Sequence, residues 1–431
     1  MLTKLKKKLY FLVAGYFLFC AKLQLHRWKP KTFIVTGSSG KTTTMHLVQA
    51  QLGNSAHYSF HANSIFGIAF DVLGMSRKTL LKNEWIKLFL LAPIKAFKKP
   101  YSEKIYIAEV DCDRPKEGAM IARLLQPEGV VWLSSGKTHG MNFDAQVKSG
   151  EFKTVEAAVA HAFSRVAIHA RELLITNSDS GVITEQLNNT QLKTGAVRHI
   201  TMNDLKRYAV DKKGTRFDAK SVSYVLQAVL PREVFYSLEA TRMLCEFLGH
   251  TFDSSFQSFQ LPPGRSSLFN GINNTTIIDS SYNSSADAFA AMMHLFQDFA
   301  AKKKWLVVGD VLEQGSNEEQ THRDMATLIA ESKLEQVLLV GPRLKKYTYP
   351  TLLDLKVPKA QVVVFEQPKD ALDYLRQNLN GSETILFKGA RFLEGIIEHL
   401  LADKKDISKL CRREIVWQRR RKEWGLYDEE A

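Results

Sequence analysis

The sequence predicts an α/β protein in which two parallel-sheet domains follow one another along the chain. Short apolar runs alternate with helical patterns, and this alternation is typical of parallel sheets with helices between the strands. A glycine-rich turn, TGSSGKTTT, joins the first apolar run to a helical pattern. A Pro/Gly-rich stretch near residue 261, LPPGRSS, then separates two series of such runs. The 431 residues suffice for two or three domains, each with its own core.

The first series begins with a β-branched strand, TFIVT at 32–36, followed by a helix over TTTMHLVQAQL. Further strands are predicted at KIYIAEVD, GVVWLSS and ELLITNSDS, and the segment 155–170 has a helical pattern. The carboxyl ends of parallel strands form one edge of the sheet, where ligands bind. Gly37, Glu109 and Ser134 fall at such ends, so we expect them at that edge.

The second series has strand-like runs at TTIIDSSYNSS, KWLVVGD, QVLLVGPR, AQVVVFEQ and TILFKGAR, with helices near 286–300 and 322–331. This is a second α/β domain of ordinary size. The predicted organisation is therefore a basic, apolar N-terminal segment at 1–30, a central domain at 31–260, a C-terminal domain at 261–403 and a basic tail at 404–431.

The net charge of +14 is concentrated in three segments. Residues 1–31 hold eight Lys/Arg and no Asp/Glu. Residues 77–104 hold eight basic and two acidic residues, and residues 404–424 hold nine basic and three acidic residues. No recognised nucleic-acid module accompanies this charge, so we expect no nucleic-acid partner. Four cysteines without CxxC spacing suit a reducing compartment, which predicts a cytoplasmic protein.

Two of the basic segments contain apolar runs, LYFLVAGYFLFCA at 9–21 and WIKLFLLAPIKAF at 85–97. This combination is typical of helices on a membrane surface, so we expect a location at the inner face of the membrane. For the first run the alternatives are a packed helix and a signal or membrane-spanning segment. For the second run the alternative is a core helix.

The turn at residues 37–42 is a candidate phosphate site. Counted back from Gly40, it is two residues shorter than the common G-x-x-x-x-G-K-[ST] loop. A strand, a glycine turn and a helix start direct backbone N–H groups toward an anion. Lys41 would reach the β- and γ-phosphates of ATP, and Thr42 would hold Mg²⁺.

The short form resembles the ATP loop T-G-x-x-G-K-T-T of the Mur ligases, which join acids to amino acids at the expense of ATP. Further motifs support the resemblance in order along the chain, from about residue 32 to 401: AEVDCDRPKEG, GKTHGMNF, LPPGR, IIDSSYNSSADAF, VVGDVLEQGSNEEQTHRDMA and ILFKGAR. The last three are most similar to the D-alanyl-D-alanine-adding (MurF) type. The resemblance implies a central P-loop ATPase-like sheet domain followed by a Rossmann-like ligase domain.

The resemblance also assigns site residues. Catalysis would involve Lys41, Glu109 and His139, and Mg²⁺ would be held by Thr42, Glu109 and His139. The nucleotide would be bound by Gly37, Ser38, Ser39, Gly40, Lys41, Thr42, Thr43, Arg265, Asp279 and Asn283, with Tyr282 in the same motif. Lys388 and Arg391 would bind a substrate carboxylate, with a plain basic loop as the alternative.

Three departures from the family pattern bear on function. The segment VEAAVAHAFSRV has no lysine where many Mur ligases carry one that bridges to a second metal; His161 or Phe163 occupies that region. The segment LPREVFYSLEA lacks the asparagines of the family. About thirty residues precede the loop, where the family has a UDP-sugar-binding domain, so we expect that domain to be lacking.

The resemblance predicts an ATP-dependent ligase that activates a carboxylate as an acyl phosphate and joins it to an amine, in cell-wall precursor synthesis or modification. Its cofactors would be ATP and Mg²⁺. Its substrates would be a small-molecule or lipid-linked carboxylate and an amino acid or peptide amine, and a partner subunit is a further candidate. The alternatives are an orthodox MurF-type ligase and a nucleotide-binding, membrane-associated scaffold without ligation.

Overall fold

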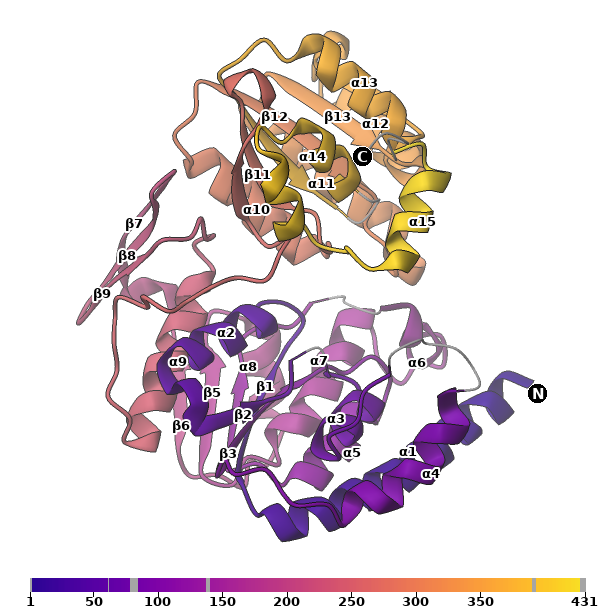
Figure 1. The fold of residues 1–431 in the computed structure, drawn as a ribbon, viewed down its shortest axis with the longest axis vertical. Helices are drawn as coiled ribbons and strands as arrows, with labels where there is room; N and C mark the ends of the chain where they lie inside the picture. The colour runs from indigo at the N-terminus through magenta and orange to yellow at the C-terminus, as the bar shows by residue number, and fades with distance from the viewer. Residues whose placement is uncertain (1, 61, 78–83, 137–139, 390–392, 427–431) are drawn as a thin grey trace. The chain divides into compact units, whose positions relative to one another are not determined.

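The computed structural model describes residues 2–60, 62–77, 84–136, 140–389 and 393–426, with side chains from Leu9 onward. The chain forms two compact units (Figure 1). Unit 1 comprises Met1–Asp204 and Tyr236–Asp253, and unit 2 comprises Leu205–Phe235 and Ser254–Ala431. This division differs from the predicted boundary near residue 261, because residues 205–235 group with the second unit.

Unit 1 is built on a six-stranded sheet in which every neighbouring pair of strands is parallel. The strands of the four central positions are almost wholly buried, as expected for a parallel sheet covered on both faces. In spatial order the strands are β2 (Ala56–Tyr58), β3 (Ile105–Val110), β1 (Lys31–Thr36), β4 (Gly129–Trp132), β5 (Leu173–Asn177) and β6 (Val197–Ile200).

Helices connect these strands, as the alternating pattern predicts. Side-chain caps fix several helix starts: Ser64, Thr154 and Ser180 each accept a hydrogen bond from a backbone N–H of the first turn. The helices of this unit are α1 (Leu2–Trp28), α2 (Lys41–Leu52), α3 (Ile65–Val72), α4 (Glu84–Ala96), α5 (Glu117–Leu125), α6 (Asp144–Lys148), α7 (Val155–Ala167), α8 (Gly181–Asn188) and most of α9 (Val234–Leu248).

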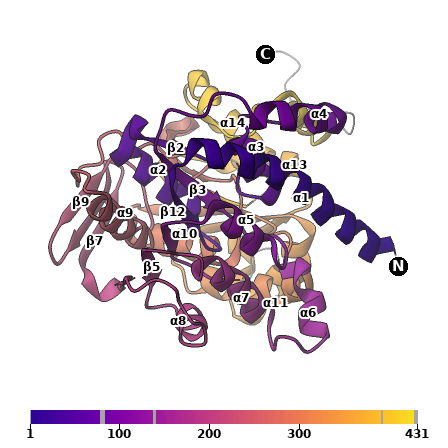
Figure 2. The same cartoon turned by 90° about the horizontal axis from the view of Figure 1, so that it is seen from below.

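Helix α1 packs along one side into the core of unit 1. Ala14, Phe17 and Ala21 are buried in the same apolar cluster as residues of α3 and α5, and Figure 2 shows α1 lying along these helices. The stretch Leu9–Trp28 is also the one described helix that is long and apolar enough to cross a membrane by length and composition. Its buried side indicates a helix packed on the protein surface.

Unit 2 contains a second six-stranded sheet, in which β10 is antiparallel and the other strands are parallel. This confirms the predicted second α/β domain. In spatial order the strands are β10 (Ser267–Asn270), β11 (Thr276–Ser280), β15 (Glu383–Lys388), β12 (Lys303–Gly309), β13 (Gln336–Val340) and β14 (Val362–Phe365). The covering helices are α10 (Ala286–Asp298), α11 (Glu318–Ala330), α12 (Tyr349–Asp354), α13 (Pro368–Asn378) and α14 (Leu393–Leu400).

The prediction did not include a three-stranded antiparallel sheet in unit 2. It consists of β7 (Leu205–Asp211), β8 (Gly214–Ala219) and β9 (Ser223–Leu226). Val210 and Val229 belong to the same apolar cluster as Ile278 and Met293, so this small sheet shares the core of unit 2.

The segment predicted as a basic tail is folded as far as it is described. It contains a 3-10 turn at Lys404–Lys409 and helix α15 (Ile415–Glu423). Arg413 donates to the carboxylate of Glu398 at 2.6 Å, and the nearly buried Arg421 lies 3.7 Å from the same group. Part of the positive charge of this segment is thus paired with carboxylates of α14.

Candidate functional site

The turn after β1 has the backbone geometry of an anion site. Gly37 has φ +130° and Gly40 has φ +79°, in the region that favours glycine. A Cβ at Gly37 would lie 2.8 Å from both the carbonyl and the hydroxyl oxygen of Ser134. Helix α2 begins directly after Gly40, so the backbone N–H groups of its first turn, from Lys41 to Thr43, have no partners within the helix.

Lys41 is held at the base of this turn. Its Nζ lies 2.6 Å from the carbonyl oxygen of Gly37 and 3.0 Å from Oδ2 of Asp111, which directly follows β3. Burial alone would lower the pKa of Lys41, but the carboxylates of Asp111 and Glu109 raise it above its ordinary value. The side chain therefore carries a fixed positive charge beside the turn at Gly37–Gly40.

Thr42 and Glu109 meet across the strand ends. The register pairs Val35 with Glu109, which brings the end of β3 beside the turn after β1. The hydroxyl of Thr42 lies 3.3 Å from Oε1 and 3.2 Å from Oε2 of Glu109. Hydroxyl and carboxylate oxygens are the donors that Mg²⁺ prefers, so these two residues fit the predicted metal in their chemistry.

The loop that follows β4 forms the other wall of the turn. Ser134 accepts from the backbone N–H of Ser39 and donates to its carbonyl oxygen, both at 2.8 Å. The backbone N–H of Gly136 donates to the hydroxyl of Ser38 at 2.6 Å. The predicted edge position of Ser134 is confirmed, and the conformation of the short loop depends on this neighbouring segment.

The predicted metal ligand His139 lies outside the described residues, as does Arg391. Within the part of the chain that is described, no three His, Cys, Asp or Glu side chains are arranged to hold a metal. Where many family members carry a lysine, α7 has Phe163, which is buried in the core near Trp132, and an exposed His161.

A second cluster of predicted residues lies in unit 2, at the carboxyl ends of β11 and β15. Asp279 is fully buried, and its Oδ1 accepts from the backbone N–H of Ser281 at 2.9 Å. Its Oδ2 is buried with no hydrogen-bond partner among the described residues. Burial raises the pKa of this carboxyl. A buried oxygen without a donor is the kind of group that a ligand satisfies.

Lys388 is a buried strand residue and not part of a loop. It is the last residue of β15, and its Nζ donates to the carbonyl oxygens of Ser280 at 3.4 Å and Asn283 at 2.5 Å. Burial, together with the nearby charge of Arg265, lowers its pKa to about 7. Lys388 thus holds the loop that follows β11 and contains Ser281, Tyr282 and Asn283. Its contact with a substrate carboxylate stays a prediction.

Tyr282, in the same loop, has two guanidinium groups near its ring. Arg265 is 5.0 Å and Arg412 is 5.3 Å from the centroid of its ring. Arg412 also donates to the carbonyl oxygens of Ser281, at 3.2 Å, and Tyr282. The basic segment after residue 404 therefore fixes the loop that carries Asn283.

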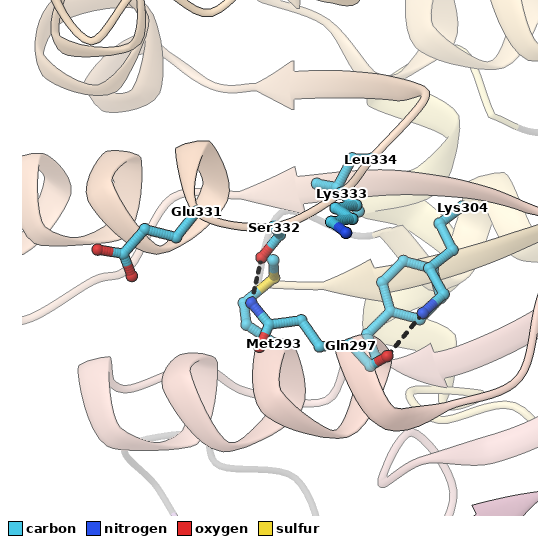
Figure 3. Close-up of a pocket in the computed structure, with 8 residues that line it drawn as sticks. Met293, Gln297, Lys304, Glu331, Ser332, Lys333 and Leu334 are labelled. Carbon is cyan, nitrogen blue, oxygen red and sulfur yellow. Dashed lines mark hydrogen bonds between the residues drawn. The ribbon is translucent and has the colours of Figure 1, made fainter.

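A cavity of about 260 Å³ in unit 2 contains none of the predicted site residues. Figure 3 shows Gln297 and Ser332 hydrogen-bonded to one another at its wall, at 2.8 Å. Its lining includes Lys304, near the start of β12, and Leu334, just before β13. The cavity thus lies at the amino ends of the strands, whereas ligand sites of such sheets lie at the carboxyl ends.

The comparisons with known proteins agree with this arrangement. Residues 264–391 match the family model described as Mur ligase, glutamate ligase domain. The UDP-N-acetylmuramoyl-tripeptide–D-alanyl-D-alanine ligase of Bacillus subtilis is 24% identical over 394 residues, covering 88% of this chain and 78% of the relative.

Two solved structures share the fold. The MurF ligase from Thermotoga maritima in complex with ADP superposes with a TM-score of 0.68 at 20% identity, covering 92% of this chain and 84% of that one. A MurF structure from Acinetobacter baumannii also gives 0.68, at 17% identity, covering 91% and 80%.

Residues 264–391 are thus similar to the glutamate ligase domain of Mur ligases, and both sheets share the fold of the MurF structures, in agreement with the resemblance of the sequence motifs. The B. subtilis relative and the two solved structures described above are MurF-type ligases, so the similarity of the chain is to this type.

Three residues of these clusters were absent from the predicted site. Asp111 had a usable signal, because it stands two residues after Glu109 just beyond a strand end. Ser134 was predicted at the sheet edge without a role in the turn. Arg412 had no signal, because its contacts join segments about 130 residues apart.

The buried Lys388 gives a pH-dependent stability. Its folded pKa of about 7 lies below the ordinary value of 10.5, so between these values the unfolded chain binds the extra proton. The free energy of unfolding then rises with pH across this window, by on the order of 1 kcal/mol per unit. Urea unfolding of Lys388→Met should lose this part of the slope, while Lys359→Met, at an exposed position of unit 2, should keep it. Equal slopes for all three proteins would contradict the assignment.

Proposed function

We propose that this chain is an ATP-dependent ligase that joins a carboxylic acid to an amine through an acyl phosphate. The observation that carries the proposal is the turn at Gly37–Gly40 with Lys41 fixed between Gly37 and Asp111, and Thr42 beside Glu109. It combines backbone donors, one fixed cation and a pair of oxygen ligands. The Mur ligase character of the chain and the ADP complex of its T. maritima structural neighbour support ATP as the nucleotide.

The proposed reaction has two steps. A carboxylate oxygen of the acid attacks the γ-phosphorus of ATP, the bond to the bridging oxygen breaks, and ADP leaves. The amine then attacks the carbonyl carbon, and phosphate departs with the former carboxylate oxygen while the amine loses a proton. Lys41 reduces the repulsion between the carboxylate and the triphosphate in the first step.

Thr42 and Glu109 are the described residues that would hold Mg²⁺, and His139 is a third predicted ligand. When bound, the ion would neutralise charge on the phosphate oxygens. Arg265, Asp279 and Asn283 remain the predicted nucleotide-binding residues of unit 2. The unpartnered Oδ2 of Asp279 supports this prediction, because a ligand hydroxyl would satisfy it.

The proposed substrates are a cell-wall precursor carrying a free carboxylate and an amino acid or peptide amine. The B. subtilis relative favours a UDP-linked muropeptide and D-alanyl-D-alanine as one specific pair. The other candidate for the acid is a lipid-linked muropeptide, which accords with the membrane location that we propose for the chain. A nucleotide-binding scaffold without ligation is the competing function, supported by the absence of lysine from α7.

Release of phosphate from ATP separates these functions. The assay contains the full chain, Mg²⁺, ATP and D-alanyl-D-alanine, with either the UDP-linked or the lipid-linked muropeptide tripeptide as the acid. Ligation predicts phosphate release only when acid and amine are both present, and the better acid identifies the substrate class. Equal ATP turnover without either substrate, or no turnover with any pair, would contradict the ligase and favour the scaffold.

A further inference from the structure

The exposed side of α1 and α4 forms a continuous apolar surface within unit 1. On α1, Leu9, Leu12 and Phe19 are 60%, 73% and 62% exposed. With Tyr16 they recur at spacings of three and four residues, which places them on one helix face. The buried Ala14, Phe17 and Ala21 occupy the other face. The exposed residues of α1 therefore do not belong to the core of unit 1.

Helix α4 continues this surface. Ile86, Leu90 and Ile94 recur every four residues and are 67%, 68% and 67% exposed, and Phe97 follows at 65%. The opposite side carries Leu88, Ala92 and Ala96, all buried. Together the two helices and Phe97 account for eight of the fourteen large hydrophobic side chains exposed in the described residues. Such a concentration marks an interaction surface.

The two helices are fixed side by side (Figure 1). The hydroxyl of Tyr16 donates to the carbonyl oxygen of Phe89 at 2.8 Å, and the rings of Phe17 and Phe89 lie 5.0 Å apart. Arg27 donates to the carbonyl oxygens of Ala96 and Lys98, at 3.2 and 2.8 Å. The contacts advance in the same direction along both helices. The two apolar ridges therefore run parallel on a preformed platform.

Positive charge surrounds this platform. Lys22, Lys87, Lys98 and Lys99 are exposed, and residues 1–31 contain no acidic residue. A second copy of the chain would bring like charges together at the same surface, which is unfavourable. An anionic lipid surface satisfies both features, because it accepts apolar side chains and attracts lysines.

We propose that the α1–α4 platform, defined by the exposed apolar residues named above with its four lysines, is a docking surface for an anionic membrane. This proposal names the surface by which the chain would reach the membrane location given under the proposed function. It holds whether or not the chain is a ligase. The ridges of both helices enter the interface between lipid headgroups and acyl chains, and the lysines contact the anionic headgroups.

Co-sedimentation of the full chain with vesicles tests this proposal. The vesicles contain phosphatidylcholine alone or phosphatidylcholine with phosphatidylglycerol. Binding is expected to the anionic vesicles and to fall at high salt. The triple variant Ile86→Ser, Leu90→Ser, Ile94→Ser should reduce the partition coefficient at least about tenfold. These side chains are exposed, so the fold should survive, as circular dichroism would check.

Matched variants make the result specific. Ile415→Ser with Val416→Ser removes two exposed apolar groups, 67% and 57% exposed, from α15, and binding should stay unchanged. Replacing Lys22, Lys87, Lys98 and Lys99 with glutamine should weaken binding about tenfold or more, whereas Lys404→Gln with Lys405→Gln should not. The double variant Lys41→Met, Asp111→Asn removes the charge of Lys41 without leaving a buried carboxylate unpaired. It should bind vesicles normally, which separates docking from ATP chemistry.

Three outcomes would overturn the proposal: no binding to anionic vesicles, equal losses in the α4 and α15 variants, or a lipid-free dimer that the α4 variant abolishes. The last outcome, seen by analytical ultracentrifugation, would make the platform an interface between copies.

Discussion

Lys41→Ala is expected to reduce phosphate release from ATP by at least about hundredfold, because in the proposed reaction the residue supplies the fixed charge beside the transferred phosphate. In the structure its Nζ contacts the carbonyl oxygen of Gly37 and the carboxylate of Asp111. No rearrangement is therefore needed to place this charge at the turn. The measurement is steady-state phosphate release with saturating acid and amine, at several ATP concentrations.

The substitution has a second effect that must be separated from the first. Asp111 is 5% exposed, and losing the Lys41 partner of this carboxylate should destabilise unit 1 by about 3–5 kcal/mol. The double variant Lys41→Met, Asp111→Asn replaces both charges and should recover much of the stability without recovering turnover. Lys31→Ala, at the exposed start of β1, is the matched control. Full turnover in the double variant would show that Lys41 has only a structural role.

Arg412→Met is expected to destabilise unit 2 by about 3 kcal/mol and to weaken ATP binding. Glu394 is fully buried; Arg412 lies 3.4 Å from one of its carboxylate oxygens and Arg421 lies 3.9 Å from the other. Removing the closer partner leaves buried charge that Arg421 compensates only in part. The loss also frees the carbonyl oxygens of Ser281 and Tyr282. Urea unfolding and isothermal titration with ADP measure the two effects.

A double-mutant cycle with Glu394→Gln isolates the buried pair. The double variant should recover most of the unfolding free energy, because both members of the pair are neutral and Arg421 keeps Glu398 as a partner. The loop should still lack its Arg412 donors, so ADP binding should stay weak. Arg419→Met, on the exposed side of α15, should change neither quantity. If Arg412→Met behaves like this control, the C-terminal segment does not position the loop.

The sequence predicted the parts of the molecule that depend on local pattern. The strands at β1, β3, β4 and β5 follow from short apolar runs, and the turn between β1 and α2 follows from Gly37, Gly40 and Lys41. The parallel arrangement then placed Glu109 beside Thr42, because strand ends share one edge of the sheet. The Mur ligase resemblance rested on these same motifs, and the comparisons agree with it.

Contacts between distant segments were not predictable in this way. The basic residues after 404 have the composition of a solvated tail, yet Arg421 is nearly buried, because α14 supplies Glu394 and Glu398. The antiparallel sheet of β7 to β9 consists of short, polar strands, which carry a weak periodic pattern. The sequence predicted each of the two helices that form the platform, α1 and α4. It did not predict that they lie side by side, because their pairing depends on tertiary packing.

The central claim, activation of a carboxylate by phosphoryl transfer, is tested most directly with oxygen-18. UDP-N-acetylmuramoyl-tripeptide labelled in its reacting carboxylate, or the lipid-linked equivalent, is incubated with the full chain, ATP, Mg²⁺ and D-alanyl-D-alanine. Mass spectrometry then follows the amide product and the released phosphate. An acyl phosphate predicts one labelled oxygen in phosphate for each amide formed. Unlabelled phosphate, or phosphate formed without the amide, would contradict the ligase mechanism.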